Sequence, residues 1–412
     1  MEVRHGYKQT EVGVIPRDWE VTPFGRLFAF TNGVNADKTA YGKGVRFINV
    51  LEPITYSHIY GPEIPGRVEI SSSVASAYSV RPGDIVFNRT SETDSELGLA
   101  AVYVGVEQVV FGGFVIRGRP IDDTLDPMYS GYALRAKMIR SQITPMGQGA
   151  VRANIGQQNL RRVLAAIPPK PEQRAIAAAL SDVDALLGGL DRLIVKKRDL
   201  RQAAMQQLLT GNTRLPGFRG EWEVKRLGDL LRFQVGFPFS SAYFNEKGNG
   251  IRLVRNRDLK SNDQLFHYNG KHESAFVVRD GDVLVGMDGD FLPCRWNKGT
   301  ALLNQRVGRI VPKSSLDATF AYYALMGPLK EIEGVTSSTT VKHLSHGDVE
   351  NIERPLPGNS EQTAIGTVLS DMDAELSALE ARRDKTRALK QAMMQELLTG
   401  RTRLVPAGGA HA

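Results

Sequence analysis

The sequence predicts an α+β fold built from two related halves, and three observations predict it. Residues 172–215 return as residues 361–404 at a constant offset of 189 positions, so no gap falls inside the repeat. Within each copy, apolar residues recur at the spacing of a long helix with one narrow apolar stripe. Upstream of each copy lies a strand-rich stretch that hardly resembles its counterpart. We therefore expect two strand-rich α+β domains separated by two long helices, which a pseudo-two-fold axis would pack as an antiparallel coiled coil.

Each copy of the repeat is predicted to be one long helix. A helix of about 38 residues spans roughly 57 Å at 1.5 Å per residue, and a helix that long does not bury its stripe alone. The steps between stripe residues are 4 and 3, which is typical of a heptad seam. An ordinary core helix is the alternative, and the length and the gapless offset disfavour it. The predicted seam residues are Ile176, Leu180, Val183, Leu187, Leu190 and Ile194 in the first copy, and Ile365, Leu369, Met372, Leu376 and Leu379 in the second.

The ends of both helices carry recognisable signals. Pro171 and Glu172 suit the first turn of the first helix. Gly211 and Gly400 occupy the same position after each copy, where a glycine in the left-handed conformation would end the helix.

The two stretches upstream of the helices, here called the first body (residues 19–168) and the second body (222–357), are loosely related. Trp19-Glu20-Val21 returns as Trp222-Glu223-Val224 at an offset of 203 positions, whereas the helices are offset by 189. The second body is therefore shorter in its loops, which is where specificity commonly lies. Strands are expected at 100–104, 109–111, 283–285 and 307–311, and helical stretches at 128–141 and 318–330.

Composition narrows the class of protein. With 412 residues the chain can form two or three domains, and its net charge of +7 suits a polyanionic partner such as nucleic acid. A single cysteine, Cys294, allows neither a disulfide nor a cysteine-based zinc site within the chain. The sequence shows no signal peptide and no apolar run long enough for a membrane span, so we expect a cytoplasmic protein without a membrane partner.

Catalytic and metal-binding motifs are mostly missing. No phosphate-binding loop of the form G-x-x-x-x-G-K-[ST] occurs. Glu223-Val224-Lys225 has the E-x-K spacing of many nucleases, but its counterpart, residues 20–22, lacks the lysine. His343 and His346 are spaced like two metal ligands on one helical turn, yet surface or DNA-facing histidines are the favoured interpretation. We therefore predict no catalytic residue and no metal site, which points to a binding subunit.

Basic and amide side chains gather in the loops of both bodies. Arginine can bind guanine with two parallel hydrogen bonds, asparagine can bind adenine in the same way, and both also bind phosphates. For each residue taken singly, a solvated surface charge is the alternative. The candidate DNA-binding residues are Lys43, Arg46, Asn88, Arg89, Thr90, Arg152 and Asn154 in the first body, and Arg252, Arg255, Asn256, Arg257, Arg295, Lys298, Lys342 and His343 in the second.

Several distinctive segments occur in order, and most of them occur twice: residues 7–16 with Asp18-Trp19, residues 167–173 with their partners 355–357 and Glu361-Gln362, and the closing segments Leu208-Leu209-Thr210-Gly211 with Arg214-Leu215 and Leu397-Leu398-Thr399-Gly400 with Arg403-Leu404. Together these segments resemble, over essentially the whole length of the chain, the specificity subunits of type I restriction–modification enzymes. One departure is Gly358-Asn359-Ser360, which stands where the first half has Lys170-Pro171.

The resemblance implies a division of labour along the chain. Residues 1–168 and 212–357 would be target recognition domains, each reading one half of a bipartite, asymmetric target in double-stranded DNA. Residues 169–211 and 358–404 would be spacer helices that set the distance between the half-sites and dock two methyltransferase subunits, and restriction (translocase) subunits would join that core. Residues 405–412 are expected to be a disordered tail. S-adenosylmethionine, ATP and Mg²⁺ would belong to the partner subunits, with no cofactor and no catalysis in this chain.

Two other functions remain as alternatives. A coiled-coil scaffold for protein partners would show no sequence-specific DNA binding, even in the presence of those partners. A nuclease or single-chain methyltransferase would require a catalytic site that the motifs do not provide.

Overall fold

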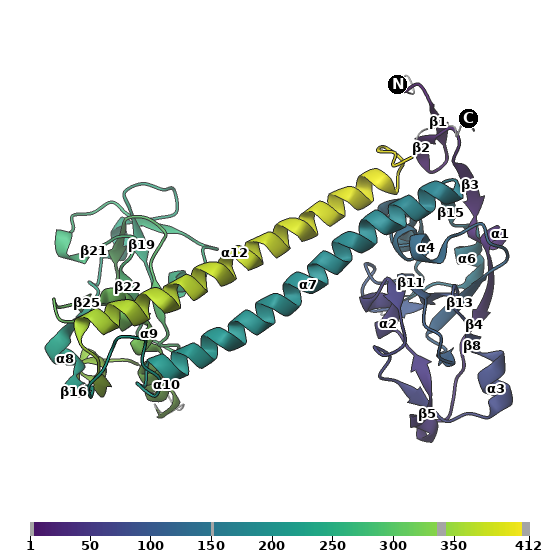
Figure 1. Cartoon of the computed structure of the whole chain (residues 1–412). Helices are drawn as coiled ribbons and strands as arrows, with labels where there is room; N and C mark the ends of the chain where they lie inside the picture. Colours follow the sequence, from purple (N-terminus) through teal and green to yellow (C-terminus); the bar gives the residue numbers. More distant parts are fainter. Residues whose placement is uncertain (1–3, 150–151, 336–342, 406–412) are drawn as a thin grey trace. The chain divides into compact units, whose positions relative to one another are not determined.

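In a computed structural model, the chain divides into two compact units. The structure describes residues 4–149, 152–335 and 343–405. Unit 1 comprises residues 1–190 and 382–412, and unit 2 comprises residues 191–381. Each predicted long helix is present as one continuous helix that contributes to both units: α7 (Lys170–Leu208) and α12 (Asn359–Leu397), drawn in teal and yellow-green in Figure 1.

Two sheets form the body of unit 1. The five-stranded sheet has the order β4-β13-β9-β11-β6, and the four-stranded sheet has the order β7-β5-β12-β8. Their strands are β4 (Phe28–Asn32), β13 (Val115–Pro120), β9 (Ile85–Asn88), β11 (Ala100–Tyr103) and β6 (His58–Ile59), and β7 (Arg67–Val68), β5 (Tyr41–Ile48), β12 (Val109–Phe111) and β8 (Ser79–Val80).

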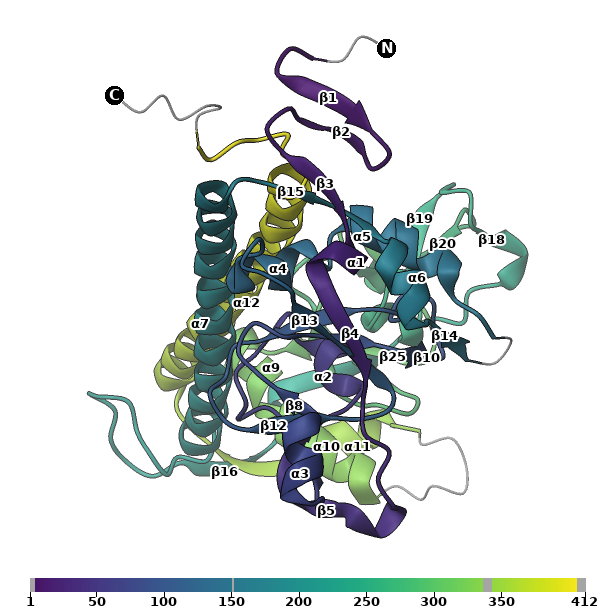
Figure 2. The same ribbon diagram turned by 90° about the vertical axis from the view of Figure 1, so that its right-hand side faces the viewer.

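Smaller elements complete unit 1. An antiparallel hairpin of β1 (Tyr7–Thr10) and β2 (Gly13–Pro16) precedes β3, as Figure 2 shows. Two further strand pairs are β3 (Glu20–Pro23) with β15 (Leu164–Ile167), and β10 (Thr90–Ser91) with β14 (Ala153–Asn154). The short helices are α1 (Phe24–Leu27), η1 (Lys38–Ala40), α2 (Leu51–Thr55), α3 (Ser72–Ala77), α4 (Pro127–Ala133), α5 (Lys137–Ile143), η2 (Thr144–Met146) and α6 (Gln157–Arg162).

Unit 2 has a body of the same kind. Its sheets have the orders β17-β25-β22-β23 and β18-β20-β19-β24-β21, and β16 pairs with β26. The strands are β16 (Glu223–Arg226), β17 (Leu231–Val235), β18 (Phe244–Asn245), β19 (Ile251–Val254), β20 (Phe266–Tyr268), β21 (Val277–Val278), β22 (Val283–Gly286), β23 (Pro293–Arg295), β24 (Ala301–Leu303), β25 (Val307–Pro312) and β26 (Glu353–Leu356). The helices are α8 (Leu227–Leu230), η3 (Ser241–Tyr243), η4 (Asn256–Leu259), η5 (Ser274–Phe276), α9 (Ala318–Ala324), α10 (Met326–Val335) and α11 (His346–Glu350).

The central strand pairings are shared by the two bodies, although the edge strands differ and the sequences are only loosely related. β13 pairs antiparallel with β4 and β9, and its counterpart β25 pairs antiparallel with β17 and β22. β12 pairs parallel with β5 and antiparallel with β8, as β24 does with β19 and β21. The predicted α+β class, the internal repeat and the four strand positions are confirmed.

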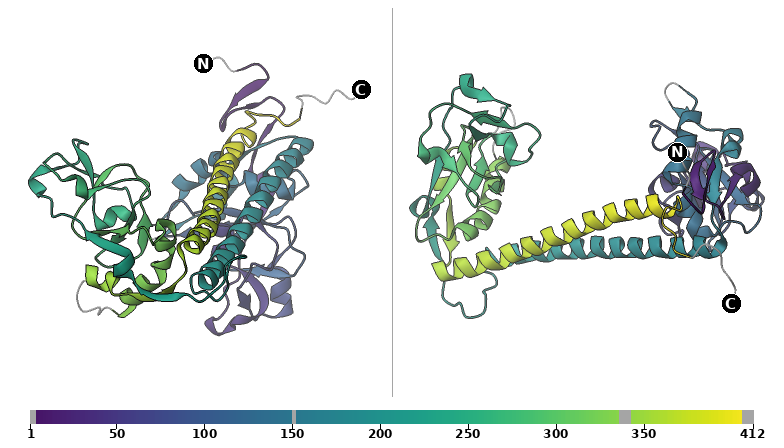
Figure 3. Two further views of the ribbon diagram at one scale, coloured as in Figure 1. Left: turned by 60° about the vertical axis from the view of Figure 1, so that its left-hand side comes forward. Right: turned by 90° about the horizontal axis from the view of Figure 1, so that it is seen from above.

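α7 and α12 pack antiparallel within each unit, lying side by side in both views of Figure 3. In unit 1, Asp184 of α7 and Lys390 of α12 form an ion pair of 2.5 Å. In unit 2, Lys197 of α7 lies 2.7 Å from Glu375 of α12, and Arg201 pairs with Asp373. The gapless repeat is reproduced in the helix bounds, because each helix has 39 residues.

The predicted seam is only partly a helix–helix seam. Ile176 and Leu180 are fully buried in the core of the first body, together with Leu397 from α12. Ile365 and Leu369 are buried in the core of the second body in the same way. Among the remaining seam residues, Leu190, Ile194 and Leu376 are buried, whereas Val183, Leu187, Met372 and Leu379 are half-buried. The first two residues of each stripe therefore fix the beginning of each helix to a body.

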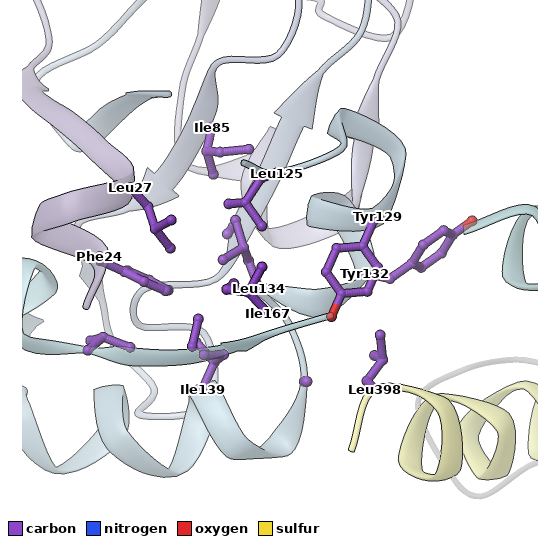
Figure 4. Close-up of a cluster of buried hydrophobic side chains, with 14 of the residues drawn as sticks. Phe24, Leu27, Ile85, Leu125, Tyr129, Tyr132, Leu134, Ile139, Ile167 and Leu398 are labelled. Atoms are coloured by element: carbon purple, nitrogen blue, oxygen red, sulfur yellow. The ribbon is translucent and has the colours of Figure 1, made fainter. Parts of the chain in front are cut away.

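Aromatic and aliphatic side chains from segments distant in sequence meet in the core of unit 1. Figure 4 shows Phe24 and Leu27 of α1, Tyr129 of α4 and Leu398, which follows α12. The rings of Phe24 and Phe28 lie 5.5 Å apart in an edge-to-face arrangement, which is a favourable geometry for aromatic pairs.

A buried glutamate anchors each long helix to its body. Glu172, fully buried near the start of α7, accepts a hydrogen bond of 2.9 Å from Trp19 Nε1 and one of 2.8 Å from Arg403 Nη2. Arg403 also donates to Asp18, which lowers the pKa of that carboxyl. Burial opposes the charge on Arg403, but the hydrogen bonds that it donates to Asp18 and Glu172 outweigh this effect and raise the pKa of Arg403.

Unit 2 repeats this anchor at the equivalent positions. Arg214 Nε and Nη2 each lie 2.5 Å from a carboxylate oxygen of Glu361, and Trp222 Nε1 donates to the same carboxylate at 3.3 Å. The predicted capping glycines follow each helix in the left-handed conformation, with φ of 73° at Gly211 and 68° at Gly400. They turn the chain so that the arginine three residues later can reach the glutamate.

Replacing Arg403 by alanine should destabilise unit 1 by about 3–5 kcal/mol, because it leaves the Glu172 carboxylate buried without its charged partner. The measurement is hydrogen exchange of unit 1 amides. Arg401→Ala is the matched control, since the pair of Arg401 with Glu396 is exposed and should contribute about 1 kcal/mol or less. Equal effects of the two substitutions would contradict the anchoring role of Glu172.

Candidate nucleic-acid interface

The candidate DNA-binding residues of the first body separate into two groups. Thr90 and Asn154 are brought opposite each other by the β10–β14 pairing. Arg89 is adjacent and donates to the carbonyl of Gly113 at 3.2 Å, and the exposed Arg152 pairs with Glu92 at 2.8 Å. These four residues form one polar cluster at the β10–β14 pair and the positions next to it.

The other three residues of the first body have structural partners. The Asn88 side chain is fully buried and donates to the carbonyl of Glu96, a placement that does not support a DNA contact. Arg46 pairs with Glu107 at 2.7 Å and donates to the carbonyl of Ile64. Lys43 is exposed and pairs with Glu69.

Several predicted residues of the second body serve its packing. Arg255 binds both carboxylate oxygens of the buried Asp258 at 2.9 Å, and its guanidinium lies over the Phe266 ring. Arg252 lies 4.9 Å from the centre of the Trp296 ring, and burial lowers its pKa. Lys298 donates to the carbonyl of Asp258 at 2.8 Å. These partners disfavour direct readout by the three side chains.

A cavity of about 570 Å³ lies beside the remaining arginines of the second body. Arg295 stacks on Tyr322 at 4.9 Å, and its buried Nη2 has no hydrogen-bond partner among the described residues. Asn256 and Arg257 line the same cavity, and Arg257 is exposed. Arginine side chains of this kind, with free donors beside a cavity, can donate hydrogen bonds to phosphate or base oxygens.

His343 joins a second cluster in this body. Its backbone forms an isolated antiparallel β-bridge with that of Asp288. Its Nδ1 lies 3.0 Å from the Asp288 carboxylate and 3.2 Å from Arg306 Nη1. Lys342, the neighbouring prediction, lies outside the described residues. Neither Asp288 nor Arg306 was predicted from the sequence.

The two polar clusters occupy the same place in the fold of each body. The backbone N–H of Arg89 donates to Phe114 and that of Met287 donates to Arg306, both at 2.9 Å. The Thr90–Asn154 pair of the first body corresponds to the Asp288–His343 bridge of the second. Phe114 immediately precedes β13, and Arg306 immediately precedes β25. An alignment of these two strands is the one sequence signal that relates Phe114 to Arg306.

The nuclease-like E-x-K spacing lies on one strand of the second body, β16. Lys225 pairs with Glu223 of its own strand at 3.0 Å, which gives the E-x-K spacing a structural partner. Within residues 4–149, 152–335 and 343–405, no group of three or more potential metal ligands converges. No helix in this part of the chain is long and apolar enough to cross a membrane.

Comparisons with known proteins agree on one family. Residues 219–387 match the family model of the type I restriction modification DNA specificity domain. A relative from Methanocaldococcus jannaschii, assigned as the type I restriction enzyme MjaX specificity subunit, is 26% identical over 425 residues, covering 97% of each chain. The EcoBI specificity subunit of Escherichia coli is 37% identical over 185 residues, covering 44% of this chain and 39% of the relative.

A solved structure shares the fold. The S subunit of a type I restriction–modification system from M. genitalium aligns over 96% of this chain and 98% of its own, with a TM-score of 0.62 and 16% identity. Two bodies with the same central strand pairings, each anchored to paired helices, define a protein built from two related domains. The chain is similar to the specificity subunits of type I restriction–modification systems, over 97% of its length in the M. jannaschii relative and over residues 219–387 in the family model.

The structure separates packing arginines from DNA-binding candidates, and a pair of substitutions tests this. Arg255→Ala should cost about 3–5 kcal/mol of stability in unit 2, because Asp258 stays buried without a counter-charge. Arg257→Ala should change stability by about 0.5 kcal/mol or less, yet lower DNA affinity evenly across sequences and reduce the salt slope by about 1. Denaturant unfolding and salt-dependent DNA binding measure the two effects, and reversed results would contradict the assignment.

Proposed function

We propose that this chain supplies DNA sequence specificity to a type I restriction–modification complex. Each body reads one half of a bipartite target in double-stranded DNA. The target is asymmetric, because the equivalent clusters of the two bodies carry different side chains. The chain recognises DNA and leaves methylation and cleavage to its partner subunits.

One observation carries the proposal: the two bodies are fixed to the helices by the same three residue types, but they expose different side chains at equivalent positions. The tryptophan, the glutamate and the arginine of the anchor recur at corresponding positions in both units. Strand pairing recurs as well, whereas Phe114, Thr90 and Asn154 are replaced by Arg306, Asp288 and His343 at the exposed clusters. Conserving a frame while changing the side chains that it presents is what the reading of two different half-sites requires.

The paired helices supply the spacing and the partner docking. Their 39-residue lengths are equal, and their outer faces carry exposed apolar side chains such as Leu186, Leu193 and Leu389. Those faces would receive two methyltransferase subunits, and restriction (translocase) subunits would join the assembly. S-adenosylmethionine, ATP and Mg²⁺ are then bound by these partners in the cytoplasm.

The first experiment exchanges one body. Residues 1–168 are replaced by the corresponding segment of another family member, and the full chain is co-expressed with its methyltransferase. Mapping methylated adenines across the host genome should give a two-part motif in which one half has changed and the other is retained. A change in both halves would contradict independent reading by the two bodies, and absence of any motif would favour a scaffold.

The spacing role has its own test. Seven residues of heptad sequence inserted after Leu190 and again after Ala381 keep both seams in register and lengthen the helix pair by about 10 Å. The gap between the methylated half-sites should lengthen, or methylation should be lost. Seven residues inserted into the tail beyond Val405 serve as the control, and an unchanged gap in the helix variant would show that the helices do not set it.

A further inference from the structure

The backbone at Arg306 is unusual. Its φ is +72°, and it is the one non-glycine residue with positive φ among those that the structure describes. Residues other than glycine rarely adopt this left-handed conformation, which crowds the Cβ atom. Such outliers cluster at sites where a side chain must be presented in a particular direction. Arg306 lies in the turn immediately before β25, with its carbonyl bound by the N–H of Met287.

The side chain of Arg306 is more than half exposed and forms an ion pair with a carboxylate. Its Nη1 lies 3.3 Å from Asp288 Oδ1, and the side-chain exposures are 57% and 25% respectively. His343 Nδ1 approaches the same oxygen at 3.0 Å. If Nδ1–H and Nη1–H both donate to Asp288, the three groups are satisfied together. Within the described residues, Nε and Nη2 of Arg306 make no hydrogen bond, so donors remain for a ligand.

Asp288 is itself held in position. Its backbone carbonyl accepts a hydrogen bond of 2.7 Å from Asn256 Nδ2. Asn256 also packs closely on β22, where a Cβ atom at Gly286 would lie 2.1 Å from Asn256 Oδ1. The loop that carries Asp288 is therefore fixed before any DNA arrives, as a reading site requires.

The equivalent place in the first body presents different chemistry. Phe114 stands where the second body has Arg306, and it is 57% exposed. Thr90 and Asn154 stand where the second body has Asp288 and His343. A cation beside a carboxylate is thus specific to the second body, although the backbone that presents it is shared.

We infer that Arg306 and Asp288 read one G·C base pair in the half-site of the second body, an inference that rests on the proposed function. Arginine donates two parallel hydrogen bonds to O6 and N7 of guanine in the major groove, and aspartate accepts from N4 of the paired cytosine. The two side chains already lie in contact, so the guanidinium donors of Arg306 and the carboxylate acceptor of Asp288 can face the same base pair. Asn256 and His343 are positioning residues that act through Asp288.

A phosphate is the poorer ligand for this pair. The Asp288 carboxylate lies 3.3 Å from the guanidinium, and it would repel a phosphate that approached the same donors. The neighbouring Arg257, which has no carboxylate partner in the structure's described part, is the better candidate for the backbone.

The test uses the full chain in complex with its methyltransferase subunits and duplexes that carry its mapped two-part target. Each G·C pair in turn is changed to A·T, and binding is measured at fixed salt. Wild-type complex should lose about five- to 150-fold in affinity at one pair of the second half-site, the discrimination expected of a two-bond fork. Replacing that guanine by 7-deazaguanine, which lacks the N7 acceptor, should also weaken binding.

Three variants separate base reading from other roles. Arg306→Gly should fold at least as well as the wild type, because glycine adopts positive φ without strain, and should lose discrimination at that one pair. Arg306→Lys keeps the charge but not the fork, and should lose discrimination too. Phe114→Ala, the matched change in the first body, should leave that pair fully discriminated.

Two results would overturn the inference. One is undiminished discrimination at every G·C pair in Arg306→Gly. The other is an even loss across all duplexes that Arg306→Lys restores, which would make Arg306 a phosphate contact. If the wild-type complex itself showed no sequence preference, the proposed function would fail and the inference with it, whereas the first two results leave the proposed function standing.

Discussion

The structure depends on a carboxylate buried at the beginning of each long helix. Glu172 and Glu361 are almost completely inaccessible to solvent, and a buried charge is stable only with a counter-charge and satisfied hydrogen bonds. An indole N–H from the start of the body and a guanidinium from beyond the opposite helix supply both. Three segments distant in sequence are therefore tied at one point, and the sheets and helices of each unit are built around it.

Features that depend on local sequence could be predicted. The helix bounds, the left-handed glycines Gly211 and Gly400, and the strand positions follow from spacing, turn chemistry and β-branched runs. The covering of Ile176 and Leu180 could not be predicted, because heptad spacing shows that a stripe is buried but not by which element. Strand order is a set of long-range pairings, so the shared topology of the two bodies became visible only in the structure.

The candidate site was predicted less well, for a physical reason. Residue type identifies a cation but not the carboxylate beside it, so Arg255 and Arg46 were grouped with exposed residues although both are engaged in ion pairs. Asn154 and His343 were both predicted as candidates, and they lie 189 positions apart, which is the offset of the repeat. Arg306 could not be predicted, because a left-handed arginine has no sequence signature.

The two anchors differ in when they can form during synthesis. Unit 2 is one continuous segment, so Arg214 and Glu361 are both present before residues 382–412 leave the ribosome. Unit 1 is discontinuous, and Glu172 cannot form its ion pair until Arg403, 231 residues later in the chain, has been synthesised. Domains are usually completed from the N-terminus onward. Here the order is inverted: the first body keeps an unpaired carboxylate and an open core until Arg403 is synthesised, and a chain truncated before Arg403 would lack the ion pair that completes unit 1.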